Sequence, residues 1–442
     1  IGVKTTGGSD VSGTYTSTGG TLTVGSLAQR GKIILGYNSA GNTSDALGTL
    51  DLAGASQFDA YLDELTIGEV TSSASSGTGG GTLKLAPTTY IDATEIMVSW
   101  SNMHSATQPT STIELGANTT IKADTFTVAG FRGMALVEFG AGGGTLTLSG
   151  SGAAEADLLI ANCDGGTNNS VNGHMDMSGG AFNATLDRLL IGYDISGTNN
   201  GGSVGKLTFS DGVIAANSLT LGDAGTGLGN GTLDMSGGSL TVNGDATLGT
   251  GTDVSLGAIN LTGGTLAVTG SVTGGIGTST LNVDGGAMTV GGDLIVDTLR
   301  VGYHTSEGDA AGRNASVITA GNGSVQIGSE TERTNLYVGH TNQNLTEDVV
   351  GVLNLSGSAS FTAYLNSFII GQRTVGLEGY NGDAVGTVTL PDTSYIDATS
   401  IMISDQQMWI GADPSTLTLG ANSTFKVNLF TVGANRANAR LE

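Results

Sequence analysis

The sequence predicts an all-β solenoid, in which the chain winds into stacked coils of about three short strands each. Three observations indicate this fold. A short apolar alternation followed by two glycines recurs along the chain, and glycine supplies 75 of the 442 residues whereas proline supplies only 4. In addition, no window places apolar residues at helical spacing over three turns. Many short strands separated by Gly, Asn, Asp and Ser are typical of all-β proteins.

The recurring phrase is the first strand of the predicted coil. It reads LDMSGG at 233–238, INLTGG at 259–264 and LNVDGG at 281–286. The distance from the start of one copy to the start of the next is the length of one solenoid turn rather than of a domain. Each copy leads into a second predicted strand, namely SLTV at 239–242, TLAV at 265–268 and AMTV at 287–290.

A third predicted strand reads Leu-x-Leu/Ile/Val-Gly. It occurs, among other places, at 33–36, 65–68, 189–192, 219–222 and 299–302. Because side chains alternate across a strand, we expect the inward Leu, Val and Ile residues of successive coils to stack into one narrow core column. Gly and Asn supply the positive φ that the sharp corners require.

A polar segment follows the third strand and leads to the next first strand. It runs from Tyr37 to Gly48, from Tyr193 to Gly205 and from His340 to Gly351. Because each segment leaves the same corner, we predict that these loops stack along one edge, the first candidate for a recognition surface. Tyr37, Tyr193 and Tyr303 each follow a third-strand glycine. Two interpretations are open for them, an aromatic row that stacks on sugars or on a partner, and packing of each ring over the adjacent turn.

A longer duplication is superimposed on the coils. Residues 48–138 recur as 351–442 at an offset of 303–305, with YIDAT at 90–94 matching 395–399 and LGAN at 115–118 matching 419–422. The alignment ends at Glu138 and Glu442, and the earlier block continues with Phe139. We therefore expect that residues 1–442 form one continuous solenoid that stops in mid-coil, so that the natural protein is longer or another subunit continues it.

The pattern Leu-x-Leu-x-Gly-Gly-x-Leu-x-Val with a trailing Leu-x-Leu-Gly resembles the autotransporter-associated β-strand repeats of bacterial surface proteins. The resemblance covers essentially the whole chain and is clearest in residues 175–300 and in the two long blocks. It implies a right-handed parallel β-helix that is exported to the cell exterior, often within an adhesin or a very large surface protein.

Charge and composition exclude several classes of partner. The net charge of −24 disfavours nucleic acid and anionic membranes, since both require a basic surface. No apolar run is long enough to span a bilayer. The single cysteine, Cys163, allows no intrachain disulfide and is interpreted either as a small buried apolar residue or as a reactive thiol.

Metal ligands are sought among the histidines and the acidic loop residues. The histidines, His104, His174, His304 and His340, have no zinc spacing. Candidate calcium ligands lie in successive excursions: Glu307, Asp309, Glu330, Glu332, Glu347, Asp348, Glu378 and Asp383. Coils stack about 4.8 Å apart, where two unit charges repel by roughly 1 kcal/mol even in water. A stacked acidic column therefore favours a bound cation, and the alternative is a solvated edge with staggered carboxylates.

No catalytic constellation is predicted. The chain lacks the Gly-x-Ser-x-Gly context of a nucleophile, and its 15 basic residues are scattered. Asp92 and Asp397 recur inside YIDAT, where we predict a structural turn with local Asx bonding.

These observations favour a non-enzymatic extracellular rod without a cofactor, acting as a surface filament or fibre subunit or an adhesin stalk. Since neither end looks like a cap, we expect self-association by end-to-end stacking, together with a cell-surface or polysaccharide partner. The alternative is a carbohydrate-binding or polysaccharide-cleaving β-helix protein.

Overall fold

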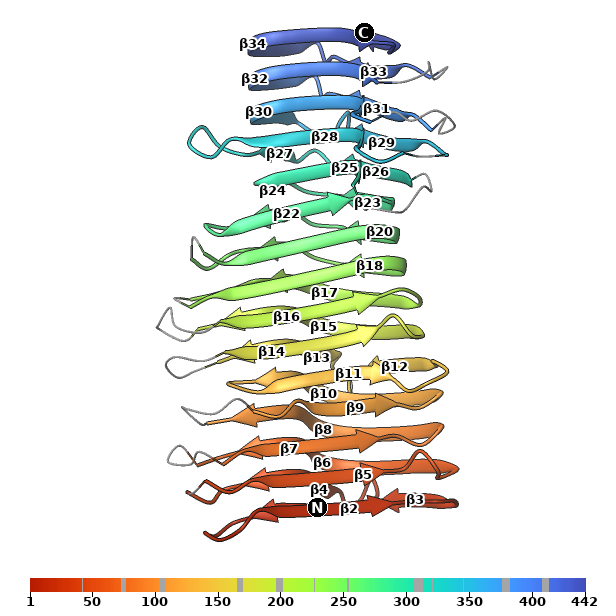
Figure 1. Cartoon of the computed structure of the whole chain (residues 1–442), viewed down its shortest axis with the longest axis vertical. Coiled ribbons are helices and arrows are strands. Elements are labelled where there is room, and N and C mark those ends of the chain that lie inside the picture. Colours follow the sequence, from red (N-terminus) through yellow and green to blue (C-terminus); the bar gives the residue numbers. More distant parts are fainter. Residues whose placement is uncertain are drawn as a thin grey trace.

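The strands of the described residues are stacked into a rod (Figure 1). The computed structural model describes all residues except 42, 73–76, 103–107, 165–169, 196–201, 226, 253, 306–312, 320, 345, 376–381 and 408–412. The described residues form 35 strands and no helix, and every ladder between named strands is parallel. This confirms the predicted parallel β-helix with three strands in a typical coil.

Three flat sheet faces enclose the core, and we number them in the order in which the chain visits them. Face 1 consists of β2 (Val11–Thr16), β5 (Ala46–Asp51), β7 (Gly79–Lys84), β9 (Ser111–Leu115), β11 (Met134–Phe139), β14 (Val171–Met177), β16 (Ser203–Phe209), the first parts of β18 (Gly229–Val242) and β20 (Leu256–Val268), β22 (Thr278–Val283), β25 (Thr298–His304), β28 (Thr334–Thr341) and the second parts of β30 (Ser360–Arg373), β32 (Thr393–Gln406) and β34 (Asn422–Asn435).

Face 2 consists of β3 (Thr21–Val24), the first parts of β6 (Gln57–Val70), β8 (Thr88–Ser101) and β10 (Asn118–Gly130), β12 (Thr145–Ser149), the first parts of β15 (Ala181–Asp194) and β17 (Val213–Leu221), the second parts of β18 and β20, β23 (Gly286–Val290), β26 (Arg313–Thr319), β29 (Val349–Asn354), β31 (Ala384–Thr389), β33 (Ser415–Thr418) and β35 (Ala439–Leu441).

Face 3 consists of β1 (Val3–Lys4), β4 (Gly31–Asn38), the second parts of β6, β8 and β10, β13 (Ala156–Cys163), the second parts of β15 and β17, β19 (Ala246–Leu248), β21 (Val272–Gly274), β24 (Leu294–Val296), β27 (Ser324–Ile327) and the first parts of β30, β32 and β34. Figure 1 looks onto face 1 with the N-terminus at the bottom and face 2 on the right. The strands of face 1 run to the right and the chain then turns back onto face 2, so the coils wind right-handedly.

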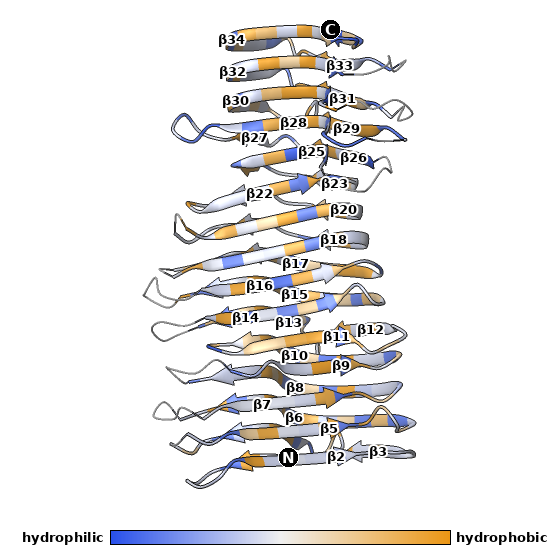
Figure 2. Ribbon diagram, viewed as in Figure 1, coloured by the Kyte–Doolittle hydropathy of each residue, from blue (hydrophilic) through white to orange (hydrophobic). Residues whose placement is uncertain are grey.

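The inward side chains form the predicted column. On face 2, Leu240, Leu266 and Met288 occupy the same position in successive coils, and all three are buried. Figure 2 shows hydrophobic residues recurring in the strands along the whole rod. Because each coil covers the column of the one below, the buried apolar residues form one continuous core cluster rather than separate domain cores.

One repeat unit near the middle of the chain contains an additional strand. Ala258 pairs with Thr280 of the next coil, and Thr280 pairs with Thr298 of the coil after that. The coil from Thr280 to Thr298 is shorter than the coil from Ala258 to Thr280. Between them the chain forms β23, β24 and then β25 after a single intervening residue, Asp297. The strand with the third-strand motif, β25, therefore lies on face 1. The next first-type strand, β26, lies on face 2, and every later strand type is displaced by one face. We call this displacement the phase slip.

The phase slip makes the prediction of a single loop edge wrong. Up to residue 277 the connections from third-type to first-type strands join face 3 to face 1, whereas from β25 onward they join face 1 to face 2. In Figure 1 the later first-type strands β26, β29, β31 and β33 lie on the right of the rod. The connections therefore begin at two different edges of the rod, because a whole strand was added between the two sets.

The two long blocks adopt the same structure despite the slip. β6 and β30 have the same length, as do β8 and β32. The likeness also extends further back, since β3 and β4 have the lengths of β27 and β28. We refer to residues 21–138 and 324–442 as the N-terminal block and the C-terminal block.

Candidate functional surfaces

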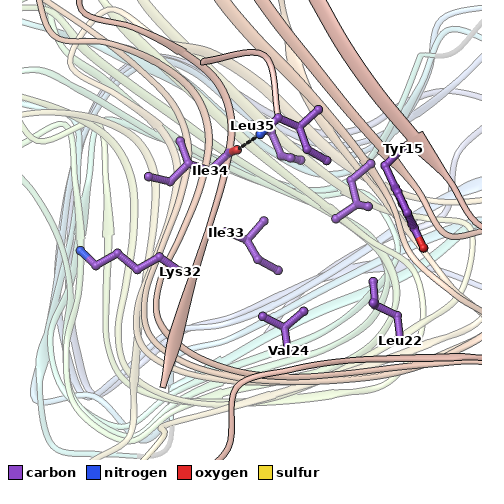
Figure 3. Close-up of a pocket in the computed structure, with 9 residues that line it drawn as sticks. Tyr15, Leu22, Val24, Lys32, Ile33, Ile34 and Leu35 are labelled. Carbon is purple, nitrogen blue, oxygen red and sulfur yellow. Dashed lines mark hydrogen bonds between the residues drawn. The ribbon is translucent and has the colours of Figure 1, made fainter. Parts of the chain in front are cut away.

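The N-terminal end of the rod is an open, apolar hollow. Its volume is about 370 Å³, and it is lined by Ile1, Tyr15, Leu22, Val24, Lys32, Ile33, Ile34, Leu35 and Leu50. Figure 3 shows Leu22, Val24 and Ile33 pointing into the three-sided space between the strands. These are the inward residues of the first full coil, and in this chain no full coil lies beneath them.

The C-terminal end is open in the same way. Phe126 and Val128 of β10 are fully buried, because Leu158 and Ile160 of the next coil cover them. Their equivalents in the C-terminal block are Phe430, which is only partly buried, and Val432, which is 45% exposed. The interior of the chain thus shows how such a coil end is covered.

The three tyrosines of the predicted aromatic row do not come together. Tyr37 and Tyr193 lie in one outward row of face 3, several coils apart, with Trp100 between them. Tyr303 lies on face 1, because the phase slip moved its strand there. Sequence reasoning placed all three on one edge because it assumed that each coil holds three strands.

Tyr303 belongs instead to an aromatic cluster on face 1. Its ring centroid lies 4.7 Å from that of Tyr337 and 4.9 Å from that of His340, with which it stacks at 12°. The Arg300 guanidinium lies 5.0 Å from the centre of the Tyr303 ring. Burial lowers the pKa of His340 to about 4, so this imidazole is neutral at pH 7. The cluster therefore presents two partly exposed tyrosines beside one cation.

The other histidines are dispersed. His174 hydrogen bonds with the Thr208 hydroxyl at 3.1 Å, and burial lowers its pKa. His304 Nδ1 lies 3.4 Å from an Asp284 carboxylate oxygen. His104 is outside the described residues. Across the described part of the chain, no three His, Cys, Asp or Glu side chains gather around a point that could hold a metal.

The acidic excursions bring two of the predicted residues together. The Asp383 N–H donates to Asp348 Oδ1 at 2.8 Å, and burial, followed by the negative charge of Asp348, raises the pKa of Asp383 to about 6. In the N-terminal block the corresponding residue is Thr78, whose hydroxyl donates to Asp45 at 2.8 Å. Glu307, Asp309 and Glu378 lie outside the described residues, while Glu330, Glu332 and Glu347 are described and are not part of this pair.

Asp92 and Asp397 do not form turns, and that prediction is wrong. Both lie within long strands, β8 and β32, where each accepts a hydrogen bond from an arginine at 2.7 Å. Arg30 also donates to the Leu62 carbonyl at 2.8 Å and to the Asp92 carbonyl at 3.0 Å. It therefore ties its own coil to the next two.

The C-terminal block repeats this arginine clamp. Arg333 donates to the carbonyls of Leu365 and Asp397 at 3.2 and 3.0 Å. Sequence reasoning missed the clamp because Arg30 precedes residue 48, where the alignment began. Arg30 and Arg333 are separated by the same offset as the two blocks, and this was the signal that could have revealed the clamp.

The single cysteine, Cys163, is buried in the core, as the first of its two interpretations expects. Among the described residues, no helix is long and apolar enough to cross a membrane. Comparisons with protein-family models, with curated proteins and with solved structures found no match to this chain.

Proposed function

We propose that this protein is a non-enzymatic structural rod of the cell exterior, which stacks end to end into a surface filament, a fibre or an adhesin stalk. The observation that carries the proposal is the continuous core column, in which each coil covers the apolar residues of the coil before it. The resemblance to autotransporter-associated repeats supports the surface location. A rod of this kind acts through its length and through what it displays.

The two ends are chemically suited to one another. The N-terminal hollow is lined mostly by apolar side chains, and the C-terminal coil presents Phe430, Val432 and Leu429, the last of which is 60% exposed. Covering them removes apolar surface from water at roughly 25 cal/mol per Å². It also pairs the backbone N–H and C=O groups of the last coil, which otherwise form a sheet edge.

Electron microscopy and light scattering test the stacking. The wild-type chain should form particles whose length increases with concentration, and Leu429→Asp with Val432→Asp should reduce them to single rods. The matched control is Thr278→Asp with Thr280→Asp on face 1, away from both ends, which should leave particle length unchanged. Single rods of the wild-type chain at all concentrations, or end variants that elongate as the wild type does, would contradict end-to-end stacking.

A second candidate is a carbohydrate-binding rod, favoured by the cluster around Tyr303 and Tyr337. Aromatic rings beside planar hydrogen-bonding groups suit the apolar face and the hydroxyls of a sugar, and Arg300 and Asn282 lie in the same row, 3.1 Å apart. Tyr337→Ala should abolish co-sedimentation with polysaccharide, whereas Ile34→Ala, at the equivalent position of the N-terminal block, should not. Equal binding by both variants would eliminate this candidate.

A further inference from the structure

Two outward rows on one side of the rod carry no charge over ten successive strands. They run along face 2 from β12 to β33, and together we call them the neutral face. The residues are Thr147 and Ser149, Asn183 and Thr185, Val213 and Ala215, Ser239 and Thr241, Thr265 and Ala267, Ala287 and Thr289, Ser316 and Ile318, Val352 and Asn354, Thr387 and Thr389, and Thr416 and Thr418. All are at least partly exposed, on a chain whose net charge is −24.

The neighbouring face differs over the same coils. Outward positions of face 1 carry Asp176, Lys206, Asp234 and Arg300, and Lys206 pairs with Asp234 at 2.7 Å. Charges also reappear in the same two rows of face 2 beyond the neutral face, with Lys122 below it and Arg440 above it. The absence of charge from two adjacent outward rows is therefore bounded on face 2. A single outward row of face 3, from Leu190 to Thr362, is also uncharged.

The phase slip provides independent evidence on whether the lack of charge belongs to this face or to the repeat motif. In the N-terminal block, the first-type strands lie on face 1 and end with the outward residues Asp51, Lys84 and Glu114. In the C-terminal block, the slip places the equivalent strands on the neutral face. The three equivalent residues there are Asn354, Thr389 and Thr418. These three charged residues thus correspond to uncharged residues within the neutral face, whereas Glu138 of the next coil corresponds to Glu442, which lies above the neutral face and is charged.

Neutrality therefore follows the physical face and not the repeat motif. Below the slip the neutral face is made of second-type strands, and above it of first-type strands, yet both present small uncharged side chains. Folding the coil does not require this, because the same strand type carries charges on face 1. A molecule that packs against this face would exclude charged side chains from it, and this accounts for the pattern.

We propose that the neutral face is the surface on which a second molecule of this chain packs side by side. Charge favours this occupant, because each rod carries −24 and contact through these two rows brings no charged side chain of one rod against those rows of the other. Small Thr, Ser, Ala and Val side chains also allow two sheets to interdigitate at about 10 Å separation. Val213, 58% exposed, and Ile318, 36% exposed, supply apolar contact area.

The size of the surface is sufficient for a stable pair. Ten strands at about 4.8 Å spacing extend over roughly 45 Å, and a strand segment of about four residues is roughly 13 Å wide. Each rod then buries on the order of 600 Å², or about 1,200 Å² for the pair, which exceeds the roughly 1,000 Å² expected of a specific interface. Because no ion pairs hold this interface, added salt should strengthen it by screening the repulsion between the acidic remainders of the rods.

Analytical ultracentrifugation of the full chain at several salt concentrations tests the proposal. The wild type should form a dimer whose Kd falls as salt is raised, and Thr265→Glu with Thr289→Glu, at the centre of the neutral face, should raise that Kd at least tenfold. The matched control is Thr278→Glu with Thr280→Glu on face 1 of the adjacent coil, which should leave the Kd unchanged. Far-UV circular dichroism and thermal unfolding establish that both variants fold as the wild type does.

Electron microscopy separates this pairing from end-to-end stacking, since side-by-side pairs double the particle width whereas end stacking increases only its length. Double-width particles that disappear in the neutral-face variant support the proposal, whether or not the particles also elongate. A wild type of single width at all concentrations overturns it, as does equal weakening by the face 1 control. A monomeric wild type whose neutral-face variant alone loses co-sedimentation with insoluble polysaccharide would also overturn it, in favour of a saccharide occupant.

Discussion

Replacing Arg30 with alanine should destabilise its coils more than replacing Arg333 destabilises the equivalent ones. The two arginines make the same three hydrogen bonds, and their aspartate partners are 5% and 9% exposed. The difference lies in a third residue. Lys426 Nζ is 2.8 Å from the second carboxylate oxygen of Asp397, whereas Lys122, its counterpart, makes no ion pair with Asp92 in the described part of the chain.

The size of each loss of stability depends on whether the aspartate still has a cation beside it after the arginine is removed. Arg30→Ala leaves Asp92 buried without a cation, for which the typical cost is about 3–5 kcal/mol, reduced to about 3 kcal/mol because Arg30 itself is 21% exposed to solvent. Arg333→Ala leaves Lys426 in place, and we expect a cost of about 1–2 kcal/mol, mainly from the lost carbonyl contacts. The ratio between the two costs, rather than either value, is the test.

Hydrogen exchange measured by mass spectrometry is the suitable assay, because a solenoid unfolds locally and a single free energy of unfolding is not required. Amides of β6 and β8 should exchange at least about 100-fold faster in Arg30→Ala, and those of β30 and β32 no more than about 30-fold faster in Arg333→Ala. Adding Lys426→Met to Arg333→Ala should bring the C-terminal block to the N-terminal value. Equal acceleration in the two single variants, or no further effect of Lys426→Met, would refute the reasoning.

Three further predictions concern pH and backbone geometry. The folded-state pKa of His340 is about 4, below its usual value, so the stability that the neutral ring contributes should be complete above pH 6.5 and lost as pH falls towards 4, by up to about 3 kcal/mol. His340→Tyr, the residue of the N-terminal block, should flatten this dependence in thermal unfolding between pH 7 and 4, and an unchanged slope would contradict it. The pH dependence that Asp383 contributes has the opposite sign, because its pKa of about 6 lies above its usual value. Stability should therefore fall as pH rises from about 4 to 6, and Asp383→Thr, which copies Thr78, should stabilise the chain at pH 7 but not at pH 4; stabilisation equal at both pH values would count against this. Gly371 has φ +70°, and a Cβ at this position would meet the Ser415 hydroxyl. Gly371→Ala should therefore lower the free energy of unfolding by about 2 kcal/mol or more, measured by urea unfolding. Gly152→Ala is the control and should have no effect, because open space surrounds Gly152.

The sequence by itself determined the elements of this protein and their equivalence. Alternation with period two and glycine punctuation are local patterns, so the strands at 239–242 and 265–268 and the inward column they form could be read directly. The constant offset between 48–138 and 351–442 likewise predicted two blocks, and β6 and β30 do have the same length. Strand alternation and block duplication are patterns of residue order, so they can be identified from the sequence without a structure.

Only the tertiary structure decided which face each strand occupies. The residues of β24 lack the third-strand glycine and gave no signal of an additional strand, yet they rotate everything after them by one face. The arginine clamp joins residues that are far apart in the chain, and the neutral face combines two strand types that share no motif. These features depend on how many strands one coil needs to close, which is a property of the stacked coils and not of any local segment. The candidate surfaces are therefore set by the winding of the chain, although every strand that builds them is written in its sequence.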